Sequence, residues 1–440
     1  MNIQDITTKL NITLSPMQEA ASKAFIQSHD NLIILSPTGS GKTLAYLLPL
    51  TQFVQQGDAS VQAIILVPGR ELAVQSYEVF RNLGSGLRGY VCHGGRPTME
   101  EHQEIRAIHP QVIFATPGRM LDHLDKHNFE DSAIRLLVID EFDKCLQLGF
   151  QQEMSSIVEH LSPSIRKVFL SATKPDTEVP SLFDTSNFKT IDFREEDTGE
   201  RIKVFCVRSE DKDKLTTLNK LLLSLQTHCS IVFLNYRESV ERTAHFLSTQ
   251  GFSISAYHGG LDQRQREEAL YQFANHSTNI LVCTDLGSRG LDIPDVENII
   301  HYHIPETQDA YIHRIGRTAR WDKQGKVFFL LNSEEQLPAY INEADDYTID
   351  ATPCAPLQPL MTTLYIGKGK KDKLSKGDIV GFLCKTGQLK ASDIGRIDVY
   401  DHYSLVAVNA KLAEKTVSNV KGKKIKGIKT IIERHTSDKP

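Results

Sequence analysis

The chain has 440 residues, a formal net charge of −5 and 40% hydrophobic residues, so it has room for about three domains with ordinary globular cores. Its longest apolar runs, such as AIILV, fall far short of the roughly 20 residues that a membrane span requires, which excludes a membrane-spanning protein. The seven cysteines form no CxxC pair and the N-terminal MNIQDITTKL carries no secretory pattern, so we expect a cytoplasmic protein with reduced thiols rather than a zinc protein or a disulfide scaffold.

Short apolar strands alternate with helical stretches through the first 195 residues. This alternation predicts βαβ units and a largely parallel sheet that helices cover on both faces. The expected strands are 32–36, 63–67, 88–92, 111–115, 135–139 and 167–171. The polar segment 186–201 then predicts a last strand and a linker.

A second α/β pattern follows, and the two blocks are compatible with two copies of one fold. Its expected strands are 202–207, 230–234, 253–257, 279–283, 298–303 and 326–331. Three prolines between 344 and 360 predict a linker, and the last 80 residues indicate a small α+β module with an antiparallel sheet. The predicted fold class is therefore α/β, with domains at 1–195 and 202–345, a linker at 346–360 and an α+β domain at 361–436.

The charge is unevenly distributed along the chain. Residues 361–440 hold 17 basic and 8 acidic residues, whereas the preceding 360 hold 33 basic and 47 acidic ones. A small basic domain on an acidic body favours an anionic polymer as its partner. A solvated lysine-rich face is the alternative interpretation of the same charges.

Residues 32–43 read LIILSPTGSGKT, a strand that runs into a glycine-rich loop and opens a helix. Glycines in such a loop let backbone N–H groups turn toward phosphate oxygens. Lys42 is expected to neutralise the β- and γ-phosphates, and Thr43 to offer its hydroxyl to Mg²⁺. The predicted nucleotide-binding loop comprises Ser36, Pro37, Thr38, Gly39, Ser40, Gly41, Lys42 and Thr43.

Its expected partner is LLVIDEFD at 136–143, a buried strand with two acids at its carboxyl end. Ligands of open α/β sheets collect at that end, and Mg²⁺ prefers hard oxygen ligands. Asp140 is therefore predicted to anchor the metal, directly or through water. Glu141 is predicted to be the base that positions the attacking water.

The octapeptide HRIGRTAR gathers His313, Arg314, Arg317 and Arg320 far from the phosphate loop. Arginine stays charged, and its planar fork of donors matches phosphate oxygens. A nucleotide site that takes its arginines from a distant segment acts only when the two segments meet. That is the layout of a motor or a switch.

Eight motifs besides the phosphate loop and the acidic pair occur in family order, and the chain resembles a DEAD-box RNA helicase over about residues 10–335. They are Gln18 in LSPMQ, PGRELA at 68–73, HGGR at 93–96, TPGR at 116–119, SAT at 171–173, IVFLNYRES at 231–239, CTDLGSRGLDIP at 283–294 and HRIGRTAR at 313–320. The resemblance implies two RecA-like domains that close on ATP, Mg²⁺ and single-stranded RNA.

The resemblance also implies a role for each matching residue. Gln18 would read adenine, Asp292 would contact the ribose, and Arg317 and Arg320 would be arginine fingers at the γ-phosphate. For Arg314, bracing its domain remains as well supported as a phosphate contact. The residues implied to couple hydrolysis to RNA are Ser171, Ala172, Thr173, Asp143 and His313. Those implied to grip the RNA backbone are Arg70, Gly94, Gly95, Thr116, Pro117, Gly118, Arg119, Arg237, Thr284 and Arg289.

Three positions depart from the family pattern. Phe142 stands where the family usually has Ala, so its ring must repack against the SAT segment. Gly69 replaces the usual Thr of PTRELA and removes a hydroxyl. Asn11 replaces an aromatic residue that stacks on adenine, so ATP selectivity is expected to depend more heavily on Gln18.

Residues 362–434 resemble the RNA-binding domain of DbpA-type DEAD-box proteins, through TLYIGKGKKDKLSKGDIVGFL, ASDIGRIDVYDHYSLVAV and KGKKIKGIKT. The resemblance implies a divergent RNA-recognition (RRM-like) fold that targets a hairpin of the large-subunit ribosomal RNA. Tyr365 and Tyr403 are interpreted either as base-stacking residues or as core tyrosines. The lysines expected to contact phosphates are Lys368, Lys370, Lys371, Lys373, Lys421, Lys423, Lys424 and Lys426.

Taken with the resemblance, the sequence predicts an ATP-dependent RNA helicase that acts on large-subunit (23S) ribosomal RNA during ribosome assembly. Its expected partners are ATP, Mg²⁺ and RNA or pre-ribosomal particles, and we expect a monomer without membrane contact. An ATP-gated RNA clamp or a general RNA chaperone is the main alternative. A DNA helicase is a third possibility, and stimulation of its ATPase by DNA would distinguish it.

Overall fold

The computed structural model describes residues 3–37, 39–95, 97–173, 187–194, 202–285, 296–318, 324–350, 352 and 354–435. Its contacts divide the chain near residue 200 into two compact units. Among the described helices, none combines the length and the apolar character that crossing a membrane would take.

The first unit is built on a seven-stranded sheet whose strands are all parallel. Its strand order is β3-β4-β2-β5-β6-β1-β7. The strands are β1 (Leu32–Leu35), β2 (Ala63–Leu66), β3 (Gly89–Cys92), β4 (Val112–Ala115), β5 (Leu136–Ile139), β6 (Arg166–Ser171) and β7 (Lys189–Asp192). The six strands predicted from apolar runs are confirmed to within one residue at each end, and β7 is the strand expected in the polar segment that follows.

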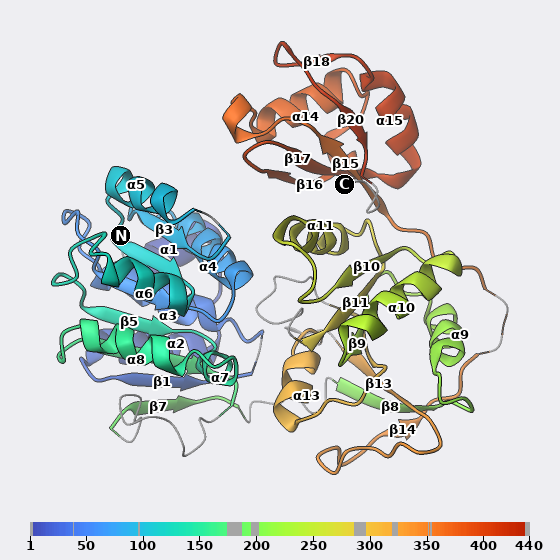
Figure 1. Cartoon of the computed structure of the whole chain (residues 1–440), viewed down its shortest axis with the longest axis horizontal. Coiled ribbons are helices and arrows are strands. Elements are labelled where there is room, and N and C mark those ends of the chain that lie inside the picture. The colour runs from blue at the N-terminus through green and yellow to red at the C-terminus, as the bar shows by residue number, and fades with distance from the viewer. Residues whose placement is uncertain are drawn as a thin grey trace. The chain divides into compact units, whose positions relative to one another are not determined.

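Helices cover both faces of this sheet (Figure 1). They are α1 (Ile3–Leu10), α2 (Pro16–Gln27), α3 (Lys42–Phe53), α4 (Arg70–Asn82), α5 (Thr98–Ile108), α6 (Pro117–Asp125), α7 (Phe142–Gln147) and α8 (Gln151–His160). Successive strand residues point to opposite faces, so Leu32 and Ile34 join one core while Ile33 and Leu35 join the other. This double burial explains why the strands are continuous apolar runs.

The second unit begins with a parallel sheet of the same topology, in the order β10-β11-β9-β12-β13-β8-β14. Its strands are β8 (Ile202–Arg208), β9 (Ser230–Leu234), β10 (Ile254–Tyr257), β11 (Ile280–Thr284), β12 (Asn298–His301), β13 (Gly325–Leu331) and β14 (Asp345–Asp346). Counted from its own first strand, this order equals that of the first sheet, which confirms two copies of one fold. The described helices here are α9 (Leu215–Leu225), α10 (Arg237–Thr249), α11 (Gln263–Ala274) and α13 (Gln308–Ile315).

Strand β14 corrects the predicted linker. Asp345 and Asp346 pair in parallel with Phe205 and Cys206 of β8, so part of the polar segment extends the second sheet. No apolar run marked this two-residue strand.

The C-terminal module is an antiparallel sheet packed on two helices, as predicted. Its sheet runs β16 (Ile394–Val399), β17 (Ser404–Asn409), β15 (Met361–Ile366) and β20 (Ile432–Arg434), with helices α14 (Lys376–Lys385) and α15 (Ala413–Val420) and a hairpin of β18 (Lys424–Ile425) and β19 (Ile428–Lys429). Leu364, Ile366, Val406 and Val408 bury one sheet face in the module's core.

The opposite face of this sheet is covered by α11 of the preceding domain. Leu405 and Ala407 lie outside the module's core cluster and are nevertheless fully buried. From α11, the hydroxyl of Tyr271 donates to the carbonyl of Arg396, and Arg264 lies over the Tyr403 ring at 5.3 Å. The module therefore packs on the second domain through its sheet.

Candidate functional site

The glycine-rich loop joins β1 to α3 and is closed by its own lysine. Gly39 and Gly41 hold φ of +85° and +86°, a left-handed conformation that other residues rarely adopt. The Nζ of Lys42 donates to the carbonyl oxygens of Ser36 and Pro37 at 2.7 and 2.8 Å. The ammonium group is therefore already inside the loop, and a phosphate would take the place of these two carbonyls.

The remaining loop residues fit the same arrangement. The N–H of Ser36 donates to the carbonyl of Ser171 at 3.0 Å, which ties the loop to the end of β6. The hydroxyl of Ser40 is buried without a hydrogen-bond partner among the described residues, and Thr43 is the second residue of α3. Thr38 lies outside the described residues.

Gln18 reaches the phosphate loop from the first turn of α2. Its Oε1 accepts from the N–H of Ser15 at 3.0 Å, in a reciprocal capping box that fixes the side chain. Its Nε2 donates to the carbonyl of Gly41 at 3.1 Å, and any side chain at residue 41 would collide with this amide. Asn11, at the position of the expected aromatic, ends α1 with a φ of +52°, which Asn tolerates better than bulky residues.

Asp140 and Glu141 follow β5 at the carboxyl end of the sheet. Burial, and then repulsion by Glu141, raises the pKa of the Asp140 carboxyl to about 7, although Lys42 opposes the shift. The Oδ1 of Asp140 accepts from the N–H of Glu141 at 2.9 Å, and Glu141 holds a left-handed φ of +51°. A divalent cation beside this carboxylate would favour its charged form.

The chemistry of the acidic pair fits a magnesium ion with its bound waters. The Oε2 of Glu141 is buried and has no hydrogen-bond partner among the described residues, whereas buried polar atoms are normally paired. A water between this oxygen and a phosphate would satisfy it. Asp140 and Thr43 would hold the ion, directly or through water, and the ion would neutralise phosphate charge.

The predicted coupling residues of the first domain lie together. The hydroxyl of Thr173 donates to Oδ2 of Asp143 at 3.0 Å, and the hydroxyl of Ser171 donates to the Thr173 carbonyl at 2.5 Å. Ala172 between them is 7% exposed. His313 is buried on α13 in the second unit.

Phe142 is accommodated by an aromatic stack. Its fully buried ring lies 4.6 Å from the ring of Phe169, with 18° between their planes, and Phe169 in turn contacts Phe188 at 5.0 Å. Phe169 lies on β6, two residues before the SAT segment. The expected repacking therefore occurs on the strand that leads into that segment.

The predicted RNA-contacting residues of the first domain follow three neighbouring strands, β3, β4 and β2. The guanidinium of Arg70 lies on the glycine pair: a Cβ at Gly94 would stand 3.0 Å from its Nη2, and one at Gly95 2.8 Å from its Nη1. The two glycines thus make room for an arginine, a reason the sequence did not reveal. The other residues at this edge are Thr116, Pro117, Gly118 and Arg119, at the start of α6.

A second glycine pair at 259–260 was missed by the sequence analysis. The tripeptide HGG occurs at 93–95 and at 258–260, each time directly after the third strand of its sheet. A Cβ at Gly260 would stand 2.7 Å from the guanidinium carbon of Arg237 at the start of α10, just as the first pair accommodates Arg70. The repeated tripeptide was the available signal.

Other predicted residues of the second domain are only partly described. Thr284 ends β11, next to β9, whose end leads to Arg237. Arg317 is 3% exposed, and its carbonyl accepts from the N–H of Val296 at 3.2 Å. The predictions on Arg289, Asp292 and Arg320 fall outside the described residues.

Arg314 braces its domain. Its side chain is 1% exposed and donates to both carboxylate oxygens of Asp285, at 2.6 and 2.8 Å. It also donates to the side-chain oxygen of Asn235 at 2.9 Å and to the carbonyl of His303 at 2.9 Å. These partners come from three segments, so of the two roles left open the structure supports the brace.

We expect the second domain to lose stability as the pH falls from about 6.5 toward 4. Burial lowers the pKa of His303 to about 4, and its Nδ1 accepts from the N–H of Asn235 at 3.1 Å, which requires a neutral ring. The unfolded chain would then take up protons first, so unfolding is favoured below the ordinary pKa. Urea midpoints measured between pH 7.5 and 5 should fall. His303→Asn should flatten this trend and exposed His245→Asn should not; equal slopes would contradict the assignment.

The lysine-rich segments of the C-terminal module meet in space. Nζ of Lys426 donates to the carbonyl of Lys373 at 2.9 Å and to Asp378 at 3.0 Å, which joins the loop before α14 to the β18–β19 hairpin. Lys368 pairs with Asp372 at 2.8 Å. Among the lysines predicted to contact phosphates, the exposed ones are Lys370, Lys371, Lys373, Lys421, Lys423, Lys424 and Lys426.

Tyr365 and Tyr403 lie outside the core cluster of the module, so the interpretation as core tyrosines is wrong. Their rings stack on each other at 5.7 Å, and Arg264 of α11 lies over both. They belong to the contact between the module and the second domain.

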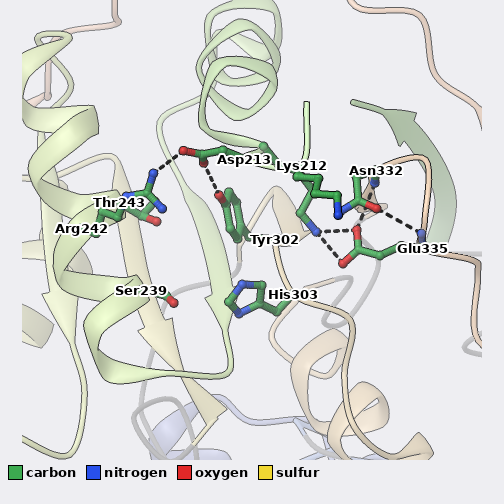
Figure 2. A pocket seen from close by; sticks show the side chains of 10 residues that line it. Lys212, Asp213, Ser239, Arg242, Thr243, Tyr302, His303, Asn332 and Glu335 are labelled. Atoms are coloured by element: carbon green, nitrogen blue, oxygen red, sulfur yellow. Dashed lines mark hydrogen bonds and ion pairs between the residues drawn. The ribbon is translucent and has the colours of Figure 1, made fainter. Parts of the chain in front are cut away.

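A pocket of about 380 Å³ lies in the second domain, lined in part by α10 and by the residues after β12 (Figure 2). Tyr302 donates to Asp213 at 3.1 Å, and Asp213 also pairs with Arg242. Lys214 pairs with Glu335 at 2.8 Å, and Lys212 pairs with Glu334 at 2.6 Å. Because each cation of the pocket already has a carboxylate, we assign it no part in binding phosphate.

Three family models match the chain in succession: DEAD/DEAH box helicase at residues 15–181, helicase conserved C-terminal domain at 213–322 and DbpA RNA binding domain at 363–434. The chain is 33% identical over 428 residues to the ATP-dependent RNA helicase DbpA of Escherichia coli (strain K12), which covers 94% of this chain and 93% of that protein. It is 31% identical over 338 residues to the ATP-dependent RNA helicase CshA of Limosilactobacillus reuteri, covering 76% and 67%.

Solved structures of RNA-bound proteins are similar as well. S. cerevisiae Dbp5 bound to RNA and ADP BeF3 matches with a TM-score of 0.67 and 26% identity, over 75% of this chain and 87% of that one. Mss116p bound to single-stranded RNA and AMP-PNP matches with the same score and identity, over 79% and 77%.

Proposed function

This chain belongs to the DEAD-box ATP-dependent RNA helicases of the DbpA type, and from that premise we propose that it separates short duplexes of large-subunit ribosomal RNA during ribosome assembly. The observation that carries the proposal is the match of a DbpA-type RNA-binding domain at residues 363–434, behind a complete pair of helicase domains. We further propose Mg²⁺ as the ion that ATP brings, and a monomer as the working form.

The proposed reaction is hydrolysis of ATP, with the attacking water held by Glu141 and the metal by Asp140. Phosphoryl transfer needs positioning and charge neutralisation more than covalent chemistry. Lys42 would neutralise the phosphates, and Arg317 and Arg320 would stabilise the charge that develops on the γ-phosphate. Thr173 and Asp143 would report the state of the site to the RNA-contacting edge.

Strand separation is energetically within reach of a binding event. Stacking contributes about 1.4 kcal/mol per base-pair step in DNA, so opening a few pairs costs only several kcal/mol. Backbone contacts read phosphate and sugar rather than sequence. The choice of ribosomal RNA is therefore assigned to the C-terminal module and its lysines.

Removing four exposed lysines of that module should weaken binding of ribosomal RNA selectively. Replacing Lys370, Lys371, Lys423 and Lys424 with Ala should raise the half-saturating concentration of a large-subunit ribosomal RNA fragment by about tenfold or more, because each phosphate contact contributes to affinity. RNA-stimulated ATPase activity measures this, with oligouridine as the second RNA. The half-saturating concentration of oligouridine should change by less than about threefold, because the two helicase domains are unaltered.

Point substitutions suit this test better than deletion of residues 361–440, because deletion would uncover the buried contact on α11. The matched control replaces Lys411, which is exposed just before α15, and Lys415, which is exposed in its first turn. If the fragment keeps its advantage over oligouridine in the four-lysine variant, the assignment of ribosomal specificity to this surface is wrong.

A further inference from the structure

Glu101 is a fully buried carboxylate in the first domain, and the nucleotide site does not use it. It lies on α5, between the loop after β3 and the start of α6. These are two of the segments predicted to grip RNA. Its surroundings show what holds the two segments in register.

Each oxygen of Glu101 has a different partner segment. Oε1 accepts from the N–H of His93, the residue before the glycine pair on which Arg70 lies. Oε2 forms an ion pair with Nε of Arg119 at 3.5 Å and lies 3.1 Å from Nε2 of His123, both on α6. One side chain thus connects the glycine turn to the helix that carries Arg119.

The two side chains that face Oε2 of Glu101 are themselves held by further contacts. His123 is fully buried, and its Nδ1 lies 2.7 Å from Nδ2 of Asn128, so both ring nitrogens have partners. Arg119 also donates through Nη1 to the hydroxyl of Thr98, at the first residue of α5. The guanidinium of Arg119 is therefore oriented by two residues of one helix.

A metal site is the competing interpretation of this cluster. One ligand atom each from Cys92, Glu101 and His123 lie within 4.8 Å of one another. A metal would need the histidine nitrogen and the carboxylate that already face each other, and it would add positive charge beside Arg119. The hydrogen-bonded network accounts for the contacts without one.

We infer that Glu101 is the positioning residue of the first-domain RNA grip, fixing Arg119 relative to the turn that supports Arg70. This inference rests on the proposed binding of RNA at that edge. Arginine contacts to phosphate depend on the direction of the planar fork. Because Arg119 is held by this network and Arg70 lies on the glycine turn, neither arginine must be ordered when RNA arrives, which lowers the entropic cost of binding.

Glu101→Gln isolates this role. The amide oxygen can still accept from His93. A change of His123 tautomer lets the amide nitrogen donate to Nε2 of that ring, provided that the Asn128 amide turns over so that its oxygen accepts from Nδ1. Nothing in the amide can pair with Nε of Arg119, so only the arginine is released. The fold should therefore survive, while the half-saturating concentration of a 20-nucleotide oligouridine rises about tenfold, the loss expected for one charge-assisted contact. Turnover at saturating RNA should stay within about twofold.

A double-mutant cycle tests whether Glu101 acts through Arg119. Glu101→Gln should add nothing in an Arg119→Gln background, and exposed Glu100→Gln on the same helix is the matched control. Additive losses, an unchanged half-saturating concentration or a loss of turnover alone would each overturn the inference. If Glu101→Gln does not fold, Thr98→Val decides the question, since it removes another contact from α5 that orients Arg119 and should show the same non-additivity.

Oligouridine is chosen because it does not depend on the C-terminal module. Loss of ribosomal preference in the lysine variants and loss of oligouridine affinity in Glu101→Gln are therefore separate results. The absence of any stimulation of the wild-type ATPase by RNA would instead contradict the proposed function itself.

Discussion

Replacing Glu141 with Gln is expected to lower RNA-stimulated ATP turnover by about 10²- to 10⁴-fold, the range for loss of a general base. The Oε2 of Glu141 is buried without a hydrogen-bond partner among the described residues, and it follows the aspartate predicted to anchor the metal. An amide has nearly the same shape but cannot accept a proton from water. Steady-state turnover, measured beside ATP and RNA binding, should therefore show loss of the chemical step with binding retained.

Strand separation by the wild type distinguishes a helicase from a clamp that hydrolyses ATP only to release RNA, and the same variant then shows whether strand separation needs hydrolysis. Single-turnover strand separation should persist in Glu141→Gln if closure on ATP drives the opening of base pairs. Loss of strand separation together with hydrolysis would favour a motor that spends ATP before opening the duplex. Exposed Glu100→Gln serves as the control for loss of an acid in this domain, and normal turnover in Glu141→Gln would refute its role.

Replacing Arg314 with Gln is expected to destabilise the second domain by about 3–5 kcal/mol, the usual effect of breaking a buried ion pair. The substitution leaves Asp285 without its bidentate partner and removes donors to Asn235 and to the carbonyl of His303. The Arg314 guanidinium also lies 5.0 Å from the centre of the Phe233 ring, so part of the packing on β9 is lost.

Amide hydrogen exchange can assign this loss to its domain. Protection should fall along β9 and β12 while β1 and β5 of the first domain keep theirs as an internal control. Arg242→Lys, on the exposed face of α10, should leave amide protection in both domains unchanged. A variant that keeps full protection but loses ATP turnover would identify Arg314 as a phosphate-contacting residue instead of a brace.

The sheets and the nucleotide loop could be predicted because their signals are local. A parallel strand buried on both faces is a continuous apolar run, so the runs LIIL, AIIL and LLVI predict strands directly. The loop at 36–43 needs glycines at positions whose left-handed φ the structure confirms. The duplicate strand order follows from the same alternation of strands and helices.

Partners far apart in sequence could not be predicted. The sequence around Arg314 is compatible with a phosphate contact and with a structural brace. Only the positions of Asp285 and Asn235 distinguish the two roles. Glu101 gave no signal at all, since a lone acid on a helix is usually solvated. The contact of Gln18 with the Gly41 carbonyl depends on how α2 packs on α3, which no residue pattern encodes.

The face of α11 that contacts the C-terminal module limits how the helicase domains can be joined to other RNA-binding domains. Arg264, Glu268 and Tyr271 are spaced to share one helix face, and Asn275 continues it. Glu268 pairs with His435 at 3.2 Å, and Asn275 donates to Thr363 at 3.2 Å. In a chimera that joined these two helicase domains to another RNA-binding domain, the polar side chains on this face of α11 would lose their partners in the C-terminal module. Exchanging tails therefore means exchanging α11 with them.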